Sequence, residues 1–99
     1  EAVEVGDASD IPVGQGKVVQ VDATPVLVIR TEERLVAFSA VCTHLGCIVA
    51  WDPERKQIHC PCHAGVFDIN GNVVSGPPPR PLPPYQVEEV GGKIMVRSA

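Results

Sequence analysis

The sequence predicts a small all-β domain in which an antiparallel β-sheet forms the base. Several runs are rich in β-branched residues and are separated by turn residues. No stretch carries the 3.6-residue apolar period of an amphipathic helix. Proline (10) and glycine (9) supply nearly a fifth of the 99 residues, which argues against a helical bundle. This length suits one domain, so we expect residues 1–99 to form a single unit.

Three strands are expected in the first part of the chain. Residues 17–21 and 26–30 are aliphatic runs, and the polar stretch 22–25 between them reads as a turn. Residues 35–39 follow after a second polar turn at 31–34. Short connections of this kind favour an antiparallel meander.

The C-terminal end predicts a β-hairpin. Residues 85–90 and 93–97 are strand-like, and only Gly91-Gly92 separates them. Two glycines suit the tight turns that join antiparallel strands.

A loop-rich segment, residues 40–76, lies between these β-rich parts and holds every cysteine and every histidine. It is followed by Gly76–Pro84, in which six of the last eight residues are proline. Proline donates no backbone hydrogen bond, so this stretch favours an extended polyproline conformation over a ladder strand. It could be a linker, a ligand for a proline-binding partner, or a cover within this domain. We favour the cover, called here the proline strap, and expect Tyr85 to anchor it against the loops.

The charge of the chain argues against nucleic acid as a partner, and its hydropathy argues against a membrane span within residues 1–99. The formal charge is −4, and no run of basic residues offers a surface for nucleic acid. The longest aliphatic run, Val26–Ile29, is far shorter than the roughly 20 residues of a membrane span. No signal-peptide pattern opens the chain, and its acidic start suggests a mature protein or a soluble fragment, with any targeting or anchoring segment already removed.

Two short motifs carry the metal chemistry. One has a Cys-x-His spacing and the other a Cys-x-x-His spacing, with 15 residues between the two: Cys42-Thr43-His44 and Cys60-Pro61-Cys62-His63. Facing loops of this kind give a site of two thiolates and two imidazoles, which suits zinc as well as an iron–sulfur cluster. Zinc there leaves two cysteines unexplained, and a pure disulfide scaffold leaves the histidines unexplained.

The segments CTHLGC and CPCH resemble the Rieske [2Fe-2S] proteins of cytochrome bc-type, quinol-oxidising complexes. The resemblance runs from about Phe38 to Val96 and implies a Rieske fold with 40–76 as the cluster-binding subdomain. By position, it implies one [2Fe-2S] cluster per chain, with these ligands and this disulfide: Cys42 and Cys60 on one iron, His44 and His63 on the other, and Cys47 bonded to Cys62.

The disulfide separates the branches of this family, because Rieske ferredoxins and ring-hydroxylating oxygenases generally lack that cysteine pair. Closing the 15-residue separation should stabilise the fold by roughly 3 kcal/mol. A structural disulfide also implies an oxidising, non-cytosolic compartment.

The resemblance implies one-electron transfer from quinol to a c-type cytochrome or similar acceptor. Quinol would dock at His44 or His63, whose non-ligating nitrogen takes the proton. A cytochrome b subunit would supply most of the quinol pocket, so we expect no turnover by the isolated domain. The expected location is the outer, periplasmic or equivalent face of an energy-transducing membrane, through an anchor outside this chain.

Two positions depart from the family pattern CPCH-G-S-x-Y. Gly65 stands at the serine and Phe67 at the tyrosine, so neither can donate a side-chain hydrogen bond to the cluster. Such bonds stabilise the reduced, more negative state. We therefore predict a reduction potential that is low for the class, which suits menaquinol better than ubiquinol or plastoquinol.

Other residues near the motifs have simpler interpretations. Leu45 resembles the family's apolar shield over the cluster, and Gly46 and Gly65 allow close backbone approach. His59 is expected to be a partly exposed strand residue, and Trp51 to pack in the core. Two alternative functions stay open: the Rieske subunit of a molybdenum oxidase such as arsenite oxidase, and a structural zinc module.

Overall fold

The computed structural model describes all 99 residues and consists almost entirely of short β-strands. One 3-10 turn, η1 (Ala8–Asp10), follows the first strand. The strands are β1 (Val3–Asp7), β2 (Gly16–Val21), β3 (Thr24–Arg30), β4 (Leu35–Ser39), β5 (Ala50–Asp52), β6 (Gln57–Cys60), β7 (Gly65–Phe67), β8 (Val73–Ser75), β9 (Pro84–Val90) and β10 (Lys93–Ser98).

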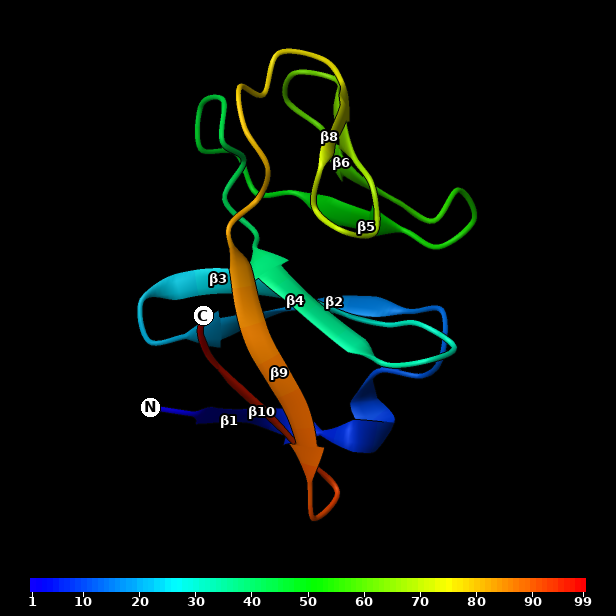
Figure 1. Cartoon of the computed structure of the whole chain (residues 1–99), viewed down its shortest axis with the longest axis vertical. Coiled ribbons are helices and arrows are strands. Elements are labelled where there is room, and N and C mark those ends of the chain that lie inside the picture. Colours follow the sequence, from blue (N-terminus) through cyan, green and yellow to red (C-terminus); the bar gives the residue numbers. More distant parts are fainter.

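Six strands form the base of the molecule, in the order β1-β10-β9-β4-β3-β2, with every neighbouring pair antiparallel. The edge strands β1 and β2 also contact each other, so the sheet curls towards an open barrel. This base occupies the lower part of Figure 1.

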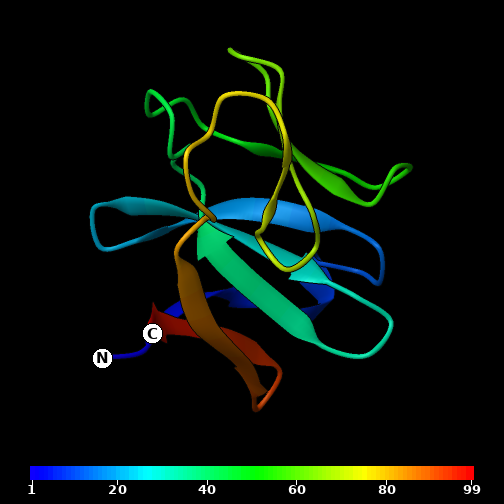
Figure 2. The same ribbon diagram turned by 45° about the horizontal axis from the view of Figure 1, so that its top comes forward.

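The other four strands form a smaller antiparallel sheet in the order β5-β6-β7-β8. It lies above the base in Figure 1, and the turn between β6 and β7 is on its side away from the base. The chain enters this part after β4 and returns to the base at β9 through the proline strap, the yellow-to-orange segment of Figure 2.

Strand β3 separates two hydrophobic cores, which explains its unbroken aliphatic sequence. Successive side chains of a strand point to opposite faces. Val26 and Val28 therefore face the interior of the base, whereas Leu27 and Ile29 face the small sheet. Both faces are buried, so no polar residue alternates with the apolar ones. The core that contains Leu27 and Ile29, beneath the small sheet, also includes Phe38, Ile58, Phe67, Cys42 and Cys60.

The predicted all-β class and the predicted strands of the base are confirmed. The Gly91-Gly92 turn joins β9 to β10 with φ of +58° and +80°, the doubly positive pair that a two-residue hairpin of this hand requires. Strand β1 and the short strands of the small sheet were not predicted. Strands of three or four residues carry too little alternation to be recognised.

The proline strap is held within the domain near its C-terminal end. Leu82 is buried in the core beneath the small sheet, and its N–H donates to the carbonyl of Gly71 at 2.9 Å. The carbonyl of Pro83 accepts from the N–H of Ser39 at 2.8 Å. The expectation for Tyr85 was wrong: it packs in the core of the base rather than against the ligand loops, because alternation in β9 turns it the same way as Val87.

Trp51 is half-buried against the core beneath the small sheet, and its indole N–H donates to the carbonyl of Gly14 at 2.9 Å. This agrees with a packing role. None of the helical structure reaches the length and hydropathy needed to cross a bilayer.

Candidate metal centre

The first motif lies on a tight loop between β4 and β5. An isolated bridge between Val41 and Ile48 closes its base. The N–H of Cys42 donates to the carbonyl of Cys47 at 2.7 Å, and the N–H of Gly46 donates to the carbonyl of Cys42 at 3.1 Å. These bonds fold the backbone back on itself and keep the intervening residues at the loop tip.

The second motif lies on the turn between β6 and β7. Cys60 ends β6 and pairs with Gly65, the first residue of β7. The residues between them form the turn, and they include Cys62 and His63. The hairpin register thus places the sulfur of Cys60 at the end of β6 and His63 in the turn that follows it.

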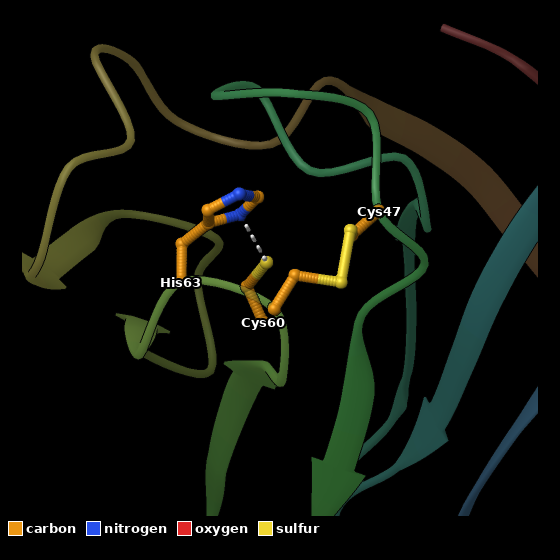
Figure 3. Close-up of a disulfide and its surroundings, with 4 residues drawn as sticks. Cys47, Cys60 and His63 are labelled. Carbon is orange, nitrogen blue, oxygen red and sulfur yellow. Dashed lines mark hydrogen bonds between the residues drawn. A yellow bond between two sulfur atoms is a disulfide. The ribbon is translucent and has the colours of Figure 1, made fainter.

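A disulfide between Cys47 and Cys62 ties the two loops together across 15 residues of sequence. Figure 3 shows this bond beside Cys60 and His63. The predicted pairing is confirmed. It leaves Cys42 and Cys60 as the free thiols of the chain, 2% and 1% exposed.

The structure brings together the four predicted ligand residues. The rings of His44 and His63 meet edge to face, with centroids 4.6 Å apart and planes at 86°. The Nδ1 atom of His63 lies 3.8 Å from the sulfur of Cys60 (Figure 3). The Nδ1 atom of His44 is buried and has no hydrogen-bond partner. A buried polar atom of this kind is rare in proteins unless something else contacts it, and a metal ion is one such partner.

Burial raises the pKa of the Cys42 thiol, and the backbone N–H groups of His44 and Leu45 oppose this rise. The neighbouring Cys60 thiol also raises it. Binding of a metal by a cysteine requires the thiolate, so ligation releases the thiol proton. The same two N–H groups are donors to a ligating sulfur.

Two nearby groups do not form a metal site. Nitrogen of His63 and the sulfurs of Cys47 and Cys62 lie within 4.8 Å of one another, but disulfide sulfurs offer no thiolate. His59 is half-buried on β6 beside Gln57 and Asp52, with its Nε2 atom 3.4 Å from the Gln57 Oε1 atom. It therefore lies on the strand as expected and points away from Cys60.

The other residues that the sequence analysis placed near the cluster differ in their exposure to solvent. Leu45 is 68% exposed at the loop tip, and Gly46 beside it has a positive φ of +81°. Gly65 and Phe67 are both buried in β7. The two positions that lack family hydrogen-bond donors thus lie in the packed wall of the site.

Two contacts from the proline strap were not predicted. The hydroxyl of Thr43 donates to the carbonyl of Arg80 at 2.7 Å, which fastens the strap to the first loop. Pro78 is buried against Gly65 in the second loop. Neither contact has a local signal, because each joins residues far apart in sequence.

The geometry thus presents two free thiols and two imidazoles on loops joined by a disulfide, a donor set that accepts zinc or an iron–sulfur cluster. The family model of the Rieske [2Fe-2S] domain matches residues 1–86. This chain belongs to the Rieske [2Fe-2S] domain family. Rieske domains hold a [2Fe-2S] cluster, and the buried thiols together with the unpartnered Nδ1 of His44 fit that group.

Three similar proteins place this Rieske domain more closely. The cytochrome b6-f complex iron-sulfur subunit of Chlorobaculum tepidum is 46% identical over 96% of this chain and 52% of its own length. The plasma membrane Rieske protein PetC3 from Synechocystis PCC 6803 is 32% identical, with a TM-score of 0.86 over 97% of this chain and 99% of that one. A chain of a hyperthermophilic respiratory complex III is 35% identical, with a TM-score of 0.77 over 93% and 73%.

The chain spans about half the length of the curated relatives that it matches. The similarity therefore covers the Rieske domain and leaves the rest of those proteins outside the comparison.

Proposed function

We propose that this Rieske domain is the electron-transfer domain of a cytochrome bc-type complex, taking electrons from quinol and passing them singly to a c-type cytochrome or similar acceptor. The observation that carries the proposal is the pair of cysteine and histidine loops joined by the Cys47–Cys62 disulfide. The resemblance to Rieske proteins associates this disulfide with the quinol-oxidising branch. The similarity to a b6-f subunit and to a complex III chain supports it over the molybdenum-oxidase alternative.

We assign the cluster ligands as Cys42 and Cys60 on one iron and His44 and His63 on the other. The two cysteines are the free, buried thiols of the chain. The Nδ1 atoms of both histidines are the ligand candidates, one because it is buried without a partner and one because it faces the Cys60 sulfur. Bound there, the cluster supplies a one-electron couple at about −150 to +300 mV.

Ligation through Nδ1 leaves Nε2 as the atom that can meet a substrate. His44 and His63 are both half-exposed although the Nδ1 atom of His44 is buried. We propose that Nε2 of His44 or His63 accepts a hydrogen bond from the quinol hydroxyl and then takes its proton. Leu45, exposed at the same loop tip, provides apolar surface for the docking partner.

The assembly around the domain follows from this role. We propose a cytochrome b subunit that completes the quinol pocket, so that the isolated domain has no turnover of its own. We place the domain at the outer face of an energy-transducing membrane, held by an anchor outside this chain. Within residues 1–99, a single domain, we assign 40–76 as the cluster-binding subdomain and 76–84 as its strap.

The reduction potential is proposed to lie low for the class. Gly65 and Phe67 offer the cluster no side-chain donor, and both are buried, which leaves backbone N–H groups such as those of His44 and Leu45 as donors near the sulfurs. Fewer hydrogen bonds leave the reduced, more negative state less stabilised. Menaquinol is therefore the proposed quinol.

Film voltammetry of the cluster-loaded domain from acidic to strongly alkaline pH tests the proposal. We expect a reversible wave whose potential falls by about 59 mV per pH unit for each coupled proton, beginning not far above neutrality. A wave that ignores pH until strongly alkaline conditions would favour a ferredoxin-like carrier. A colourless protein with bound zinc and no wave would contradict the proposal outright.

A further inference from the structure

The turn between β6 and β7 contains two residues whose identities do not match their backbone conformations. Ala64 has φ of +56°, in the left-handed region that favours glycine. Gly65, the next residue, lies outside that region, where the backbone accepts any L-residue. The lack of a side chain at position 65 therefore has a cause other than backbone conformation.

That cause is a contact with the proline strap. A Cβ atom on Gly65 would lie 2.8 Å from Cγ and 3.1 Å from Cδ of Pro78. Packed carbon atoms sit at about 3.5–4.0 Å, so the two groups cannot both be present. The ring of Pro78 is bonded at both ends to its own backbone, so a change of ring pucker is the only movement it can make without the backbone. Pro78 is buried, whereas its neighbours Pro77 and Pro79 are exposed.

The strap also lies against the turn through its own backbone. Gly76 has φ of +93°, and a Cβ atom there would be 2.8 Å from Cα of Gly65 and 2.9 Å from the carbonyl oxygen of Ala64. The bond from Thr43 to Arg80 and the buried Leu82 hold the following residues of the strap. The strap is thus fixed on both sides of Pro78 and cannot shift alone to admit a side chain at position 65.

Position 65 also borders the cluster site. It pairs with Cys60 in the β6–β7 register, and its Cβ would lie 3.4 Å from Cβ of Cys60. A group placed here reaches the surroundings of the Cys60 sulfur. Hydrogen bonds to the sulfurs and their exposure to solvent are among the factors that set the potential of an iron–sulfur cluster.

We propose that Gly65 and Pro78 form one positioning unit, in which the Pro78 ring takes the place of a side chain at position 65 and keeps hydroxyl groups and water away from the Cys60 side of the cluster. The unit holds the potential low. A serine at position 65 cannot donate to the cluster while Pro78 is present, because the two residues compete for the same space. The proposal rests on the cluster site assigned above and is independent of which quinol or acceptor the domain uses.

The test uses five variants of the cluster-loaded domain: Gly65→Ala, Gly65→Ser, Pro78→Ala, the double variant Gly65→Ser with Pro78→Ala, and Pro79→Ala as the matched control at an exposed proline. The melting temperature and the midpoint potential are measured for each. Electron paramagnetic resonance of the reduced protein reports whether the cluster is intact.

Gly65→Ala and Gly65→Ser should lower the melting temperature to a similar extent, because the added Cβ atom rather than the hydroxyl causes the clash. The double variant should melt above Gly65→Ser. Its rise in potential should exceed the sum of the changes in the two single variants, because only there does the hydroxyl have room. Pro79→Ala should leave both quantities unchanged.

Additive effects of the two substitutions on both quantities would overturn the proposal, as would a Gly65→Ser protein as stable as the parent. If the Gly65 variants do not assemble, hydrogen exchange of Pro78→Ala decides. That substitution adds no heavy atoms, and we expect the Gly65 amide to exchange faster than in the parent or in Pro79→Ala. Unchanged protection would contradict the sealing role. A parent protein with an intact cluster but no pH-dependent wave would contradict quinol oxidation and leave the Gly65–Pro78 proposal standing. A colourless protein would contradict both the proposed function and the Gly65–Pro78 proposal.

Discussion

Ala64 is the single alanine of the chain with a positive φ, +56°. A non-glycine residue in this region costs of the order of 1 kcal/mol or more. Ala64→Gly removes that conformational cost from the folded state. Glycine also has greater freedom in the unfolded chain, and this offsets part of the stabilisation. We expect a net stabilisation of about 0.5–1 kcal/mol and a melting temperature higher by a few degrees, measured by thermal denaturation.

Ala50→Gly is the matched control for this substitution. Ala50 is exposed in β5 with ordinary strand geometry, so glycine there should lower the melting temperature. Equal effects of the two substitutions would show that the conformation of Ala64 carries no strain.

Adding a hydroxyl group to Phe67 tests whether the missing hydrogen-bond donor at this position lowers the reduction potential of the cluster. It is fully buried in the same core as Cys42 and Cys60 and carries no hydroxyl. Phe67→Tyr should raise the midpoint potential, because a phenol near a cluster sulfur stabilises the reduced state. A difference of about 1 kcal/mol between the redox states corresponds to roughly 40 mV for one electron. A redox titration of the loaded protein measures it.

Phe38→Tyr makes the same chemical change elsewhere in that core. Phe38 packs near Gly71, whose Cβ would lie 2.8 Å from the Phe38 ring. Its hydroxyl should leave the potential unaltered. If Phe67→Tyr behaves like this control, the absent tyrosine is not the reason for a low potential.

At the scale of elements, the two ligand loops are short and depend on being joined. Each is closed by a few backbone hydrogen bonds, and the Cys47–Cys62 disulfide connects them. The loop-entropy model assigns about 3 kcal/mol to a bridge closing 15 residues. The double variant Cys47→Ser with Cys62→Ser should therefore lose about 3 kcal/mol of unfolding free energy in chemical denaturation.

The same double variant should also lose its cluster faster in the presence of an iron chelator, because the loops can then separate. Treating the parent protein with a reductant is the control that breaks the same bond without a substitution, and the two should agree. A variant as stable as the parent would show that the strap and the small sheet hold the loops unaided.

The sequence predicted some elements better than others, for physical reasons. Residues 26–30 and the Gly91-Gly92 hairpin carry their structure in local pattern, and they were found. The three-residue strands β5, β7 and β8 were missed, since they are stabilised by neighbours rather than by their own alternation. Tyr85 was expected against the cluster loops but packs in the core of the base, because its orientation depends on the register of β9, which a sequence does not show.

At the scale of the whole molecule, an ion pair joins the first and last strands. Lys93 on β10 pairs with Asp7 across the β1–β10 register and lies near Glu4. Its hydrogen bond and charge lower the pKa of Asp7 below 3.8, and Asp7 in turn raises the pKa of Lys93 above 10.5. Both groups are exposed, so the pair contributes little and is weakened by salt.

Lys93→Met should therefore lower stability slightly at neutral pH and in low salt. The Asp7 contribution is complete above its ordinary pKa of 3.8 and is lost as pH falls through the lowered value. The Lys93 contribution is complete below 10.5 and is lost as pH rises through the raised value. The difference from the parent should be seen between those limits and vanish at either extreme, as urea denaturation across pH would show. Lys17→Met, at an exposed lysine without an ion pair, is the control.

Composition, strand patterning and the two Cys/His motifs were enough to predict the all-β class, the base and the residue types that a [2Fe-2S] cluster needs. These properties are local: each is carried by residues within a few positions of one another. The contact of Pro78 with Gly65, the bond from Thr43 to the strap and the buried Nδ1 of His44 were visible only in the folded chain. The first two join separate segments of the chain, and the third depends on what packs around His44. Packing, which no local pattern encodes, determines all three.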